Sequence, residues 1–153
     1  MPAARKSSTS PSASASGGFT AGERAAMKER AAELKAEKQA RTAAEQEAEV
    51  LERIAEMADS DRVLAERLHA LVREVAPHLQ SRTWYGMPAY TRDGKVVCFF
   101  KPAVKFKSRY ATLGFEDAAA LDDGAMWPTS YALLEMDAAT ERTVADLVRT
   151  AAG

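Results

Sequence analysis

The sequence predicts an α+β fold, in which a small antiparallel sheet with hairpin connections packs against N-terminal helices and one C-terminal helix. Three observations support this prediction. Apolar residues recur at helical spacing between residues 45 and 75, and again between residues 144 and 151. Between these segments, residues 84–131 hold ten of the eleven aromatic residues, together with much of the β-branched character that is typical of strands.

Residues 1–20 predict a disordered tail. They are mainly Ser, Ala, Pro, Gly and Thr, and beyond Met1 they contain one large apolar residue, Phe19. Such a segment buries too little surface to offset the entropy of ordering. No apolar run follows the basic residues near the N-terminus, which argues against a secretory signal, and no stretch has the roughly 20 apolar residues that cross a bilayer. We therefore expect a soluble, cytoplasmic protein with no membrane partner.

Residues 21–44 predict a charged, exposed helix in front of a domain of residues 45–153. The composition of this segment favours helix, and Thr20 followed by Glu23 is the pattern of a capping box. Its large apolar residues are Met27 and Leu34 alone, so the helix has little to bury. A coiled-coil arm is an alternative, as is a helix that docks a partner protein or a second copy of the chain.

Two further helices are predicted to dock on the domain. Residues 45–57 carry an apolar stripe. Residues 42–44 contain neither Gly nor Pro, so the sequence leaves open whether this segment continues the first helix. Asp59-Ser60-Asp61 offers N-cap chemistry for a third helix, which ends at Pro77. On that helix His69 is predicted to lie at the surface, away from the apolar stripe.

Residues 83–100, TWYGMPAYTRDGKVVCFF, predict the first hairpin. Asp93-Gly94 is a turn signal, because Gly adopts the positive φ angles of a tight turn without a Cβ penalty. Pro88 has no N–H to donate, which places its segment at an edge or a bulge. Residues 96–100 predict an interior strand, covered on both faces or on one face with a partly exposed aromatic row on the other. Cys98, on one face with Val96 and Phe100, is predicted to be a buried hydrophobe.

The remaining predicted elements are two strands and a helix. Residues 109–115 and 130–136 are the next predicted strands, since each carries aromatic or aliphatic side chains and they follow the hairpin within the aromatic-rich region. Asp137 is the predicted N-cap of the closing helix, whose apolar stripe includes Val144 and Val148.

Aromatic and basic residues of the sheet region predict a ligand pocket. Rings can wall such a pocket and cations can form an anion-binding rim, and aromatics interleaved with basic residues can also stack the bases of single strands. The alternative is that the rings fill the core and the lysines protect a strand edge from pairing. The predicted pocket residues are Trp84, Tyr85, Met87, Tyr90, Lys101, Arg109 and Trp127.

A group of carboxylates is the predicted metal site. Glu116, Asp117, Asp122 and Asp123 could give oxygen ligands to a hard cation, although their spacing is not that of a calcium loop. A solvated acidic turn is the alternative. The single cysteine excludes an internal disulfide and a zinc site built on paired thiolates. No Gly-rich phosphate loop, G-x-S-x-G or H-E-x-x-H motif occurs, which favours a non-catalytic role.

The charge of the chain is unevenly distributed. The net charge of -1 argues against nucleic acid as a partner. Six basic residues nevertheless lie between Arg92 and Arg109 against one acid, Asp93. Between Glu116 and Asp146 the balance reverses, with eight acids against one arginine.

The segment WYGMPAYTRDGKVVCFF resembles the YdhG-like family of small bacterial proteins. The resemblance rests on Tyr-Gly-Met-Pro-Ala-Tyr at residues 85–90, on Gly94-Lys95 and on Phe99-Phe100, with Gly114-Phe115 and Trp127-Pro128 further along. It extends from about residue 48 to the C-terminus. The family is a domain-of-unknown-function family whose members are often labelled iron chaperones with a frataxin-like role. The resemblance implies an α+β fold and an accessory protein that binds iron through exposed carboxylates and passes it to an iron-accepting protein.

Overall fold

The computed structural model describes residues 20–153, apart from the side chain at position 41. The predicted tail therefore lies outside the described residues except for Thr20. The described residues form three helices and one five-stranded antiparallel sheet, which confirms the predicted α+β class. The chain divides into two compact units, Met1–Arg41 and Thr42–Gly153. The second unit begins close to the predicted domain start at residue 45.

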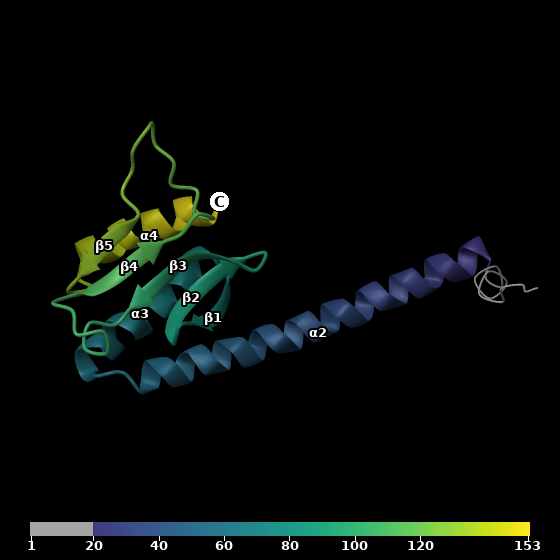
Figure 1. The fold of residues 1–153 in the computed structure, drawn as a ribbon, viewed down its shortest axis with the longest axis horizontal. Coiled ribbons are helices and arrows are strands. Elements are labelled where there is room, and N and C mark those ends of the chain that lie inside the picture. Colours follow the sequence, from purple (N-terminus) through teal and green to yellow (C-terminus); the bar gives the residue numbers. More distant parts are fainter. Residues whose placement is uncertain (1–19) are drawn as a thin grey trace, which may run out of the picture. The chain divides into compact units, whose positions relative to one another are not determined.

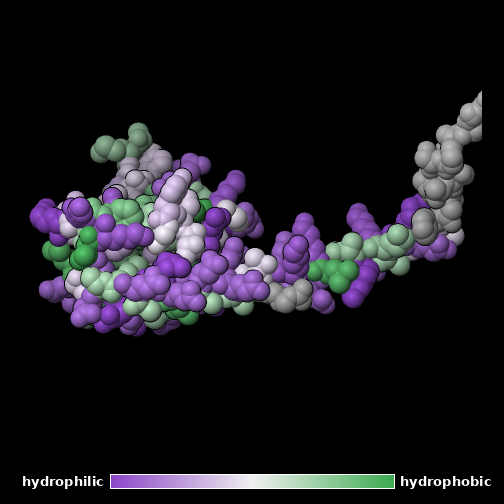
Figure 2. All heavy atoms as spheres, turned by 60° about the horizontal axis from the view of Figure 1, so that its bottom comes forward, coloured by the Kyte–Doolittle hydropathy of each residue, from purple (hydrophilic) through white to green (hydrophobic). Residues whose placement is uncertain are grey.

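The helix α2 runs from Ala21 to Ala55 without a break, so the first two predicted helical segments form one element. At its start the backbone N–H of Glu23 donates to Thr20 Oγ1 at 3.1 Å, as the capping-box pattern predicts. Every residue from 20 to 40 is exposed, including Met27 and Leu34. Hydrophilic side chains therefore dominate this part of the helix, with small hydrophobic patches between them (Figure 2).

In the second unit the sheet has strand order β1-β2-β3-β4-β5, with every neighbouring pair antiparallel. The strands are β1 (Gln80–Trp84), β2 (Met87–Arg92), β3 (Lys95–Lys101), β4 (Ala111–Phe115) and β5 (Ser130–Leu133). The helices α3 (Asp59–Val75) and α4 (Ala138–Ala152) lie on one side of this sheet (Figure 1). One face of the sheet is therefore covered by these helices, and the opposite face is not.

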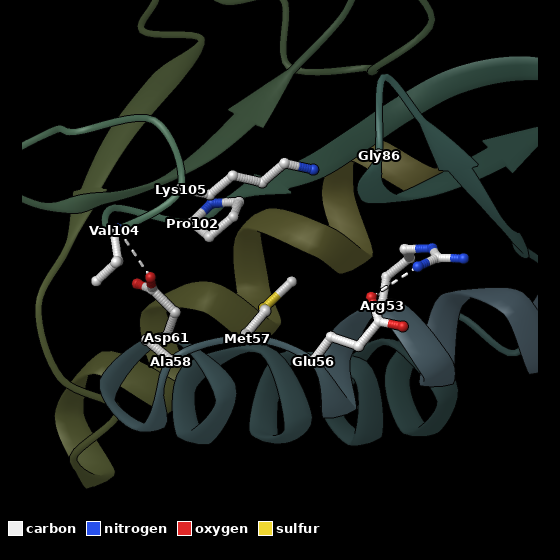
Figure 3. A pocket seen from close by; sticks show the side chains of 9 residues that line it. All are labelled: Arg53, Glu56, Met57, Ala58, Asp61, Gly86, Pro102, Val104 and Lys105. Carbon is white, nitrogen blue, oxygen red and sulfur yellow. Dashed lines mark hydrogen bonds and ion pairs between the residues drawn. The ribbon is translucent and has the colours of Figure 1, made fainter.

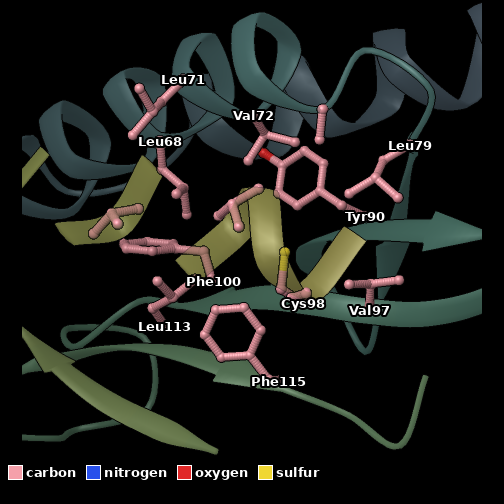
Figure 4. Packing of buried hydrophobic residues seen from close by; sticks show 14 of the residues in the cluster. Leu68, Leu71, Val72, Leu79, Tyr90, Val97, Cys98, Phe100, Leu113 and Phe115 are labelled. Atoms are coloured by element: carbon pink, nitrogen blue, oxygen red, sulfur yellow. The ribbon is translucent and has the colours of Figure 1, made fainter. Parts of the chain in front are cut away.

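The main core fills the space between the sheet and its helices. Tyr90, Cys98 and Phe100 project from β2 and β3 toward Leu68 and Val72 of α3 (Figure 4). Val50 and Ile54 belong to the same cluster, which shows that the last turns of α2 dock as their apolar stripe predicts. The C-terminal helix contributes its own stripe, with Asp137 as the predicted N-cap accepting from the Thr140 N–H at 2.8 Å.

The start of α3 differs from the prediction. Its N-cap is Ala58, and no side chain caps it. The Asp61 carboxylate is instead buried and accepts the backbone N–H groups of Ala103 and Val104 at 3.0 and 2.9 Å. The predicted N-cap role was wrong because this side chain pairs with a distant loop, a partner that local sequence does not reveal.

The β2–β3 pairing corrects two further predictions. Tyr90 pairs with Cys98 and Thr91 with Val96, so Val97 is an extra residue at a bulge. Val97 and Cys98 are both fully buried in the main core while Val96 is half-buried, so Val97 takes the place predicted for Val96 beside Cys98. Pro88 lies in the interior strand β2, but the register with β3 begins only at Ala89. At Pro88 the strand therefore has a partner on one side alone, which its missing N–H tolerates.

Candidate functional site

The face of the sheet opposite the helices carries a pair of aromatic rings. In antiparallel register, residues directly opposite each other share a face, and Ala89 pairs with Phe99 while Phe99 pairs with Gly114. The Trp84 ring meets the Phe99 ring edge to face, with centroids 5.2 Å apart. Both rings are half-buried, so part of each remains open to solvent.

Gly114 explains how the Phe99 ring is held. A Cβ at this position would lie 2.2 Å from the Phe99 ring, which is closer than any real contact. The ring therefore lies directly on the glycine backbone of β4. A glycine within a strand weakens the strand but permits this close approach. At position 114 the glycine allows the Phe99 ring to pack directly against the β4 backbone.

The β1–β2 turn places a third ring beside this pair. Tyr85 and Gly86 both have positive φ angles, 52° and 76°, as a two-residue hairpin turn with the right twist requires. The Tyr85 ring lies 5.1 Å from that of Trp84 and is 80% exposed. Its exposure is set by the turn, because the backbone directs this side chain away from the sheet.

Two lysines border the rings. Lys101 follows Phe99 on the same face of β3, and its Nζ lies 5.3 Å from the centroid of the Phe106 ring. The Nζ of Lys105 lies 5.6 Å from the same centroid and directly over Gly86. Cation–π contacts of this kind hold both ammonium groups near the Phe106 ring. We call this surface the aromatic–lysine face: Trp84, Tyr85, Phe99, Lys101, Lys105 and Phe106.

A cavity of about 290 Å³ adjoins the aromatic–lysine face at Gly86 and Lys105 (Figure 3). Its charged lining is largely engaged already, because Arg53 pairs with Glu56 at 2.6 Å and Asp61 binds two backbone N–H groups. None of the described aromatic side chains lines it. The lining residues are Arg53, Glu56, Met57, Ala58, Asp61, Gly86, Pro102, Val104 and Lys105.

The structure brings together some of the predicted pocket residues and separates others. Trp84, Tyr85 and Lys101 lie on the aromatic–lysine face, and Met87 is buried opposite Trp84 in the β1–β2 register. Tyr90 is fully buried on the other face, in the main core, so its inclusion in the pocket was wrong. The alternation of side chains along β2 places it there.

Arg109 and Trp127 lie in the connections that follow β3 and β4. The guanidinium of Arg109 lies 5.1 Å from the Tyr110 ring centroid, and Trp127 is half-buried. In residues 20–153, no ring contact or hydrogen bond joins either residue to the aromatic–lysine face. The structure therefore does not place these two among the pocket residues.

A polar chain on the helix side, which runs from the buried Tyr90 hydroxyl outward to Arg73, was not predicted from the sequence. His69 Nδ1 lies 3.0 Å from the Tyr90 hydroxyl, and its Nε2 lies 3.1 Å from Glu47 Oε1. Arg73 Nε is 3.4 Å from the same carboxylate oxygen. His69 is buried, so its predicted surface position was wrong. The charged residues on the same side of α3 suggested an exposed position, and the hydrogen-bond partner Tyr90 lies on β2, 21 residues away in the sequence.

Burial controls the chemistry of the two ionisable groups on the covered face. It raises the pKa of the Cys98 thiol to about 12 and the pKa of the Tyr90 hydroxyl well above its usual value. A thiol that stays protonated and has no solvent access is a poor nucleophile. Cys98 is therefore a core residue, as predicted.

The predicted metal carboxylates are all exposed: Glu116, Asp117, Asp122 and Asp123. Among residues 20–153, no group of three or more His, Cys, Asp or Glu side chains is arranged to hold a metal ion. The described residues also include no helix long and apolar enough to cross a bilayer. Binding of iron by these carboxylates stays a prediction.

Comparisons of the chain with protein families, curated proteins and solved structures found no match. The resemblance to the YdhG-like family therefore stays a prediction.

Proposed function

We propose that residues 42–153 form a non-catalytic binding domain that holds a planar, negatively charged ligand on the aromatic–lysine face. One observation carries this proposal. The rings of Trp84 and Phe99 meet directly on the uncovered face of the sheet, and Lys101 follows Phe99 two residues later on the same face of β3. A planar ligand can stack on such rings while a cation neutralises its charge.

The charge of the sheet supports an anionic ligand. None of the five strands contains Asp or Glu, whereas they contain Arg82, Arg92, Lys95 and Lys101. Within the described residues, neither Lys101 nor Lys105 forms an ion pair with a carboxylate. Their charge is therefore available to a ligand.

Tryptophan fluorescence tests the proposal directly. The chain has two tryptophans, so the Trp127→Phe variant leaves Trp84 as the reporter on the face. Titration with ATP should quench its emission, and uncharged adenosine should bind more weakly because it lacks the phosphates. No change in emission with ATP up to millimolar concentration would contradict the proposal.

Charge variants supply the control. Changing Lys101 and Lys105 together to alanine should weaken ATP binding at least tenfold, because it removes both ammonium groups that lie at the Phe106 ring of this face. Changing Lys28 and Lys35 to alanine removes the same charge from exposed positions of α2 and should leave the affinity unchanged. Equal losses in the two variants would show only a nonspecific effect of net charge.

Iron handling, which the resemblance to the YdhG-like family implies, is the second proposal. Exposed carboxylates bind iron weakly while it keeps part of its hydration shell, and Asp122 and Asp123 supply two neighbouring ones. Calorimetric titration with Fe(II) should give a heat of binding that falls when both are changed to asparagine. A heat equal to that of the asparagine variant would remove this proposal.

A further inference from the structure

The aromatic–lysine face differs from a small-molecule pocket in having no walls. Pockets for small ligands are concave and enclose most of the ligand, yet the cavity beside this face has no aromatic lining from the described residues. The rings lie instead on an open sheet surface and an exposed turn. A ligand that continues past one ring, such as a nucleic-acid strand, fits this geometry better than an isolated ring does.

The basic residues extend beyond the rings. From Gln80 to Phe115 the chain has a single acid, Asp93, and seven basic residues: Arg82, Arg92, Lys95, Lys101, Lys105, Lys107 and Arg109. The net charge of -1 does not reveal this excess, because acids elsewhere in the chain cancel it in the sum. Arg92 is already engaged, because its guanidinium donates to the backbone carbonyls of Ala118 and Ala152. The charge open to a partner at the aromatic–lysine face therefore comes mainly from Lys101 and Lys105.

These cations also differ from the arginines of the helices. Arg53, Arg62 and Arg149 each pair with a carboxylate one turn away, and Arg67 of α3 pairs with Glu141 of α4. Lys101, Lys105 and Lys107 form no ion pair in the described part of the chain. Binding a phosphate would therefore break no existing pair, and the release of counterions from the nucleic acid favours association.

The surface combines rings with cations. Trp84, Tyr85 and Phe99 form one aromatic group, and the ammonium groups of Lys101 and Lys105 lie 5.3 and 5.6 Å from the Phe106 ring centroid. Because Gly114 fixes the Phe99 ring on the backbone, little side-chain entropy is lost when a base stacks on it. Stacking on aromatic side chains contributes about 1–3 kcal/mol per base and does not depend on sequence.

We propose that the aromatic–lysine face binds single-stranded nucleic acid, with bases stacked on Trp84 and Phe99 and backbone phosphates beside Lys101 and Lys105. This inference rests on the proposed function and deepens it by naming the ligand class. The double helix is excluded as the preferred ligand, because its bases are stacked on one another and cannot reach the rings.

Fluorescence anisotropy of the full chain with fluorescein-labelled dT12 and U12 tests the inference. The wild-type protein should bind one or both strands, and an unlabelled duplex should compete at least tenfold less effectively. Raising salt from 50 to 200 mM should weaken binding roughly 20-fold if three phosphates are neutralised. No anisotropy change, or equal competition by the duplex, would overturn the inference.

Variants separate stacking from charge. Trp84→Ala should weaken binding at least tenfold without changing the salt dependence, and Trp84→Phe should restore most of the affinity because it keeps a ring. The Lys101→Ala, Lys105→Ala double variant should weaken binding and reduce the salt dependence. The Lys28→Ala, Lys35→Ala control should do neither. Circular dichroism confirms that each variant is folded, and equal losses in the control would overturn the inference.

The nucleotide titration distinguishes failure of the inference from failure of the proposed function. If ATP quenches Trp84 while dT12 and U12 bind no more tightly than ATP, the face holds a mononucleotide-sized ligand and the inference is wrong. If neither ATP nor the strands bind, both the inference and the proposed function are wrong.

Discussion

The two faces of the sheet differ in how far their side chains are buried and in whether their polar groups have partners within the protein. On the covered face, Tyr90, Cys98 and Phe100 are fully buried, and the Tyr90 hydroxyl has a protein partner in His69. On the other face, Trp84 and Phe99 are half-buried, and the neighbouring lysines contact rings instead of carboxylates. The covered face is thus satisfied within the chain, while the open face keeps rings and charges available for a ligand.

Neighbouring phenylalanines on β3 give the largest expected difference between the faces. Phe100→Ala should lower the free energy of unfolding by about 3–5 kcal/mol, because it leaves a cavity in a close-packed core. Phe99→Ala should cost only about 1 kcal/mol, because the ring is half-exposed and its removal opens no cavity. Urea denaturation measures both, and similar losses would show that the open face is also part of the core.

Asp61 gives the next largest effect, since its carboxylate anchors the loop that carries Lys105 and Phe106. Asp61→Ala should lower the free energy of unfolding by about 2–3 kcal/mol, because the N–H groups of Ala103 and Val104 lose their acceptor. The matched control is Asp59→Ala, whose exposed side chain pairs with Arg62 on the same helix. Hydrogen exchange should also accelerate at residues 103 and 104, and unchanged exchange there would contradict the anchoring role.

Cys98 makes the stability of the covered face sensitive to alkaline pH. Folding raises the pKa of the thiol from its ordinary value of 9.0 to about 12, so stability is fully present below pH 9.0 and falls as pH rises toward 12. At about pH 10.5 the loss should be about 2 kcal/mol. Cys98→Ala should reduce this dependence, leaving the part due to Tyr90, whose pKa is also raised. Denaturation at pH 8 and 10.5 measures it, and identical slopes in both proteins would refute the assignment.

The sequence predicted the burial of the helices better than it predicted which face of the sheet each strand residue occupies. The apolar stripes of α3 and α4 are periodic, so their burial against the sheet followed from local pattern. Tyr90 was wrongly assigned to the pocket because residue type alone does not say which face of a strand a ring occupies. The β2–β3 bulge moved Val97 into the core for a similar reason, since a register shift leaves no local signature.

Local patterns in the chain were enough to predict the α+β class, the exposed charged helix of residues 21–44, the burial of Cys98 and the crowding of aromatic and basic residues between positions 84 and 109, whereas the unbroken helix from Ala21 to Ala55 came from the structure. These features depend on composition and on periods of two or 3.6 residues, which any short window of sequence displays. The assembled fold was needed to bring Trp84 onto Phe99 over Gly114, to set Lys101 and Lys105 around Phe106, and to bury Asp61 and His69. The pairing of Trp84 with Phe99 and the burial of Asp61 and His69 depend on strand register and on contacts between residues far apart in sequence, which form only when the sheet is assembled. The lysine contacts with Phe106 are local in sequence, but they depend on the conformation of the loop that Asp61 binds.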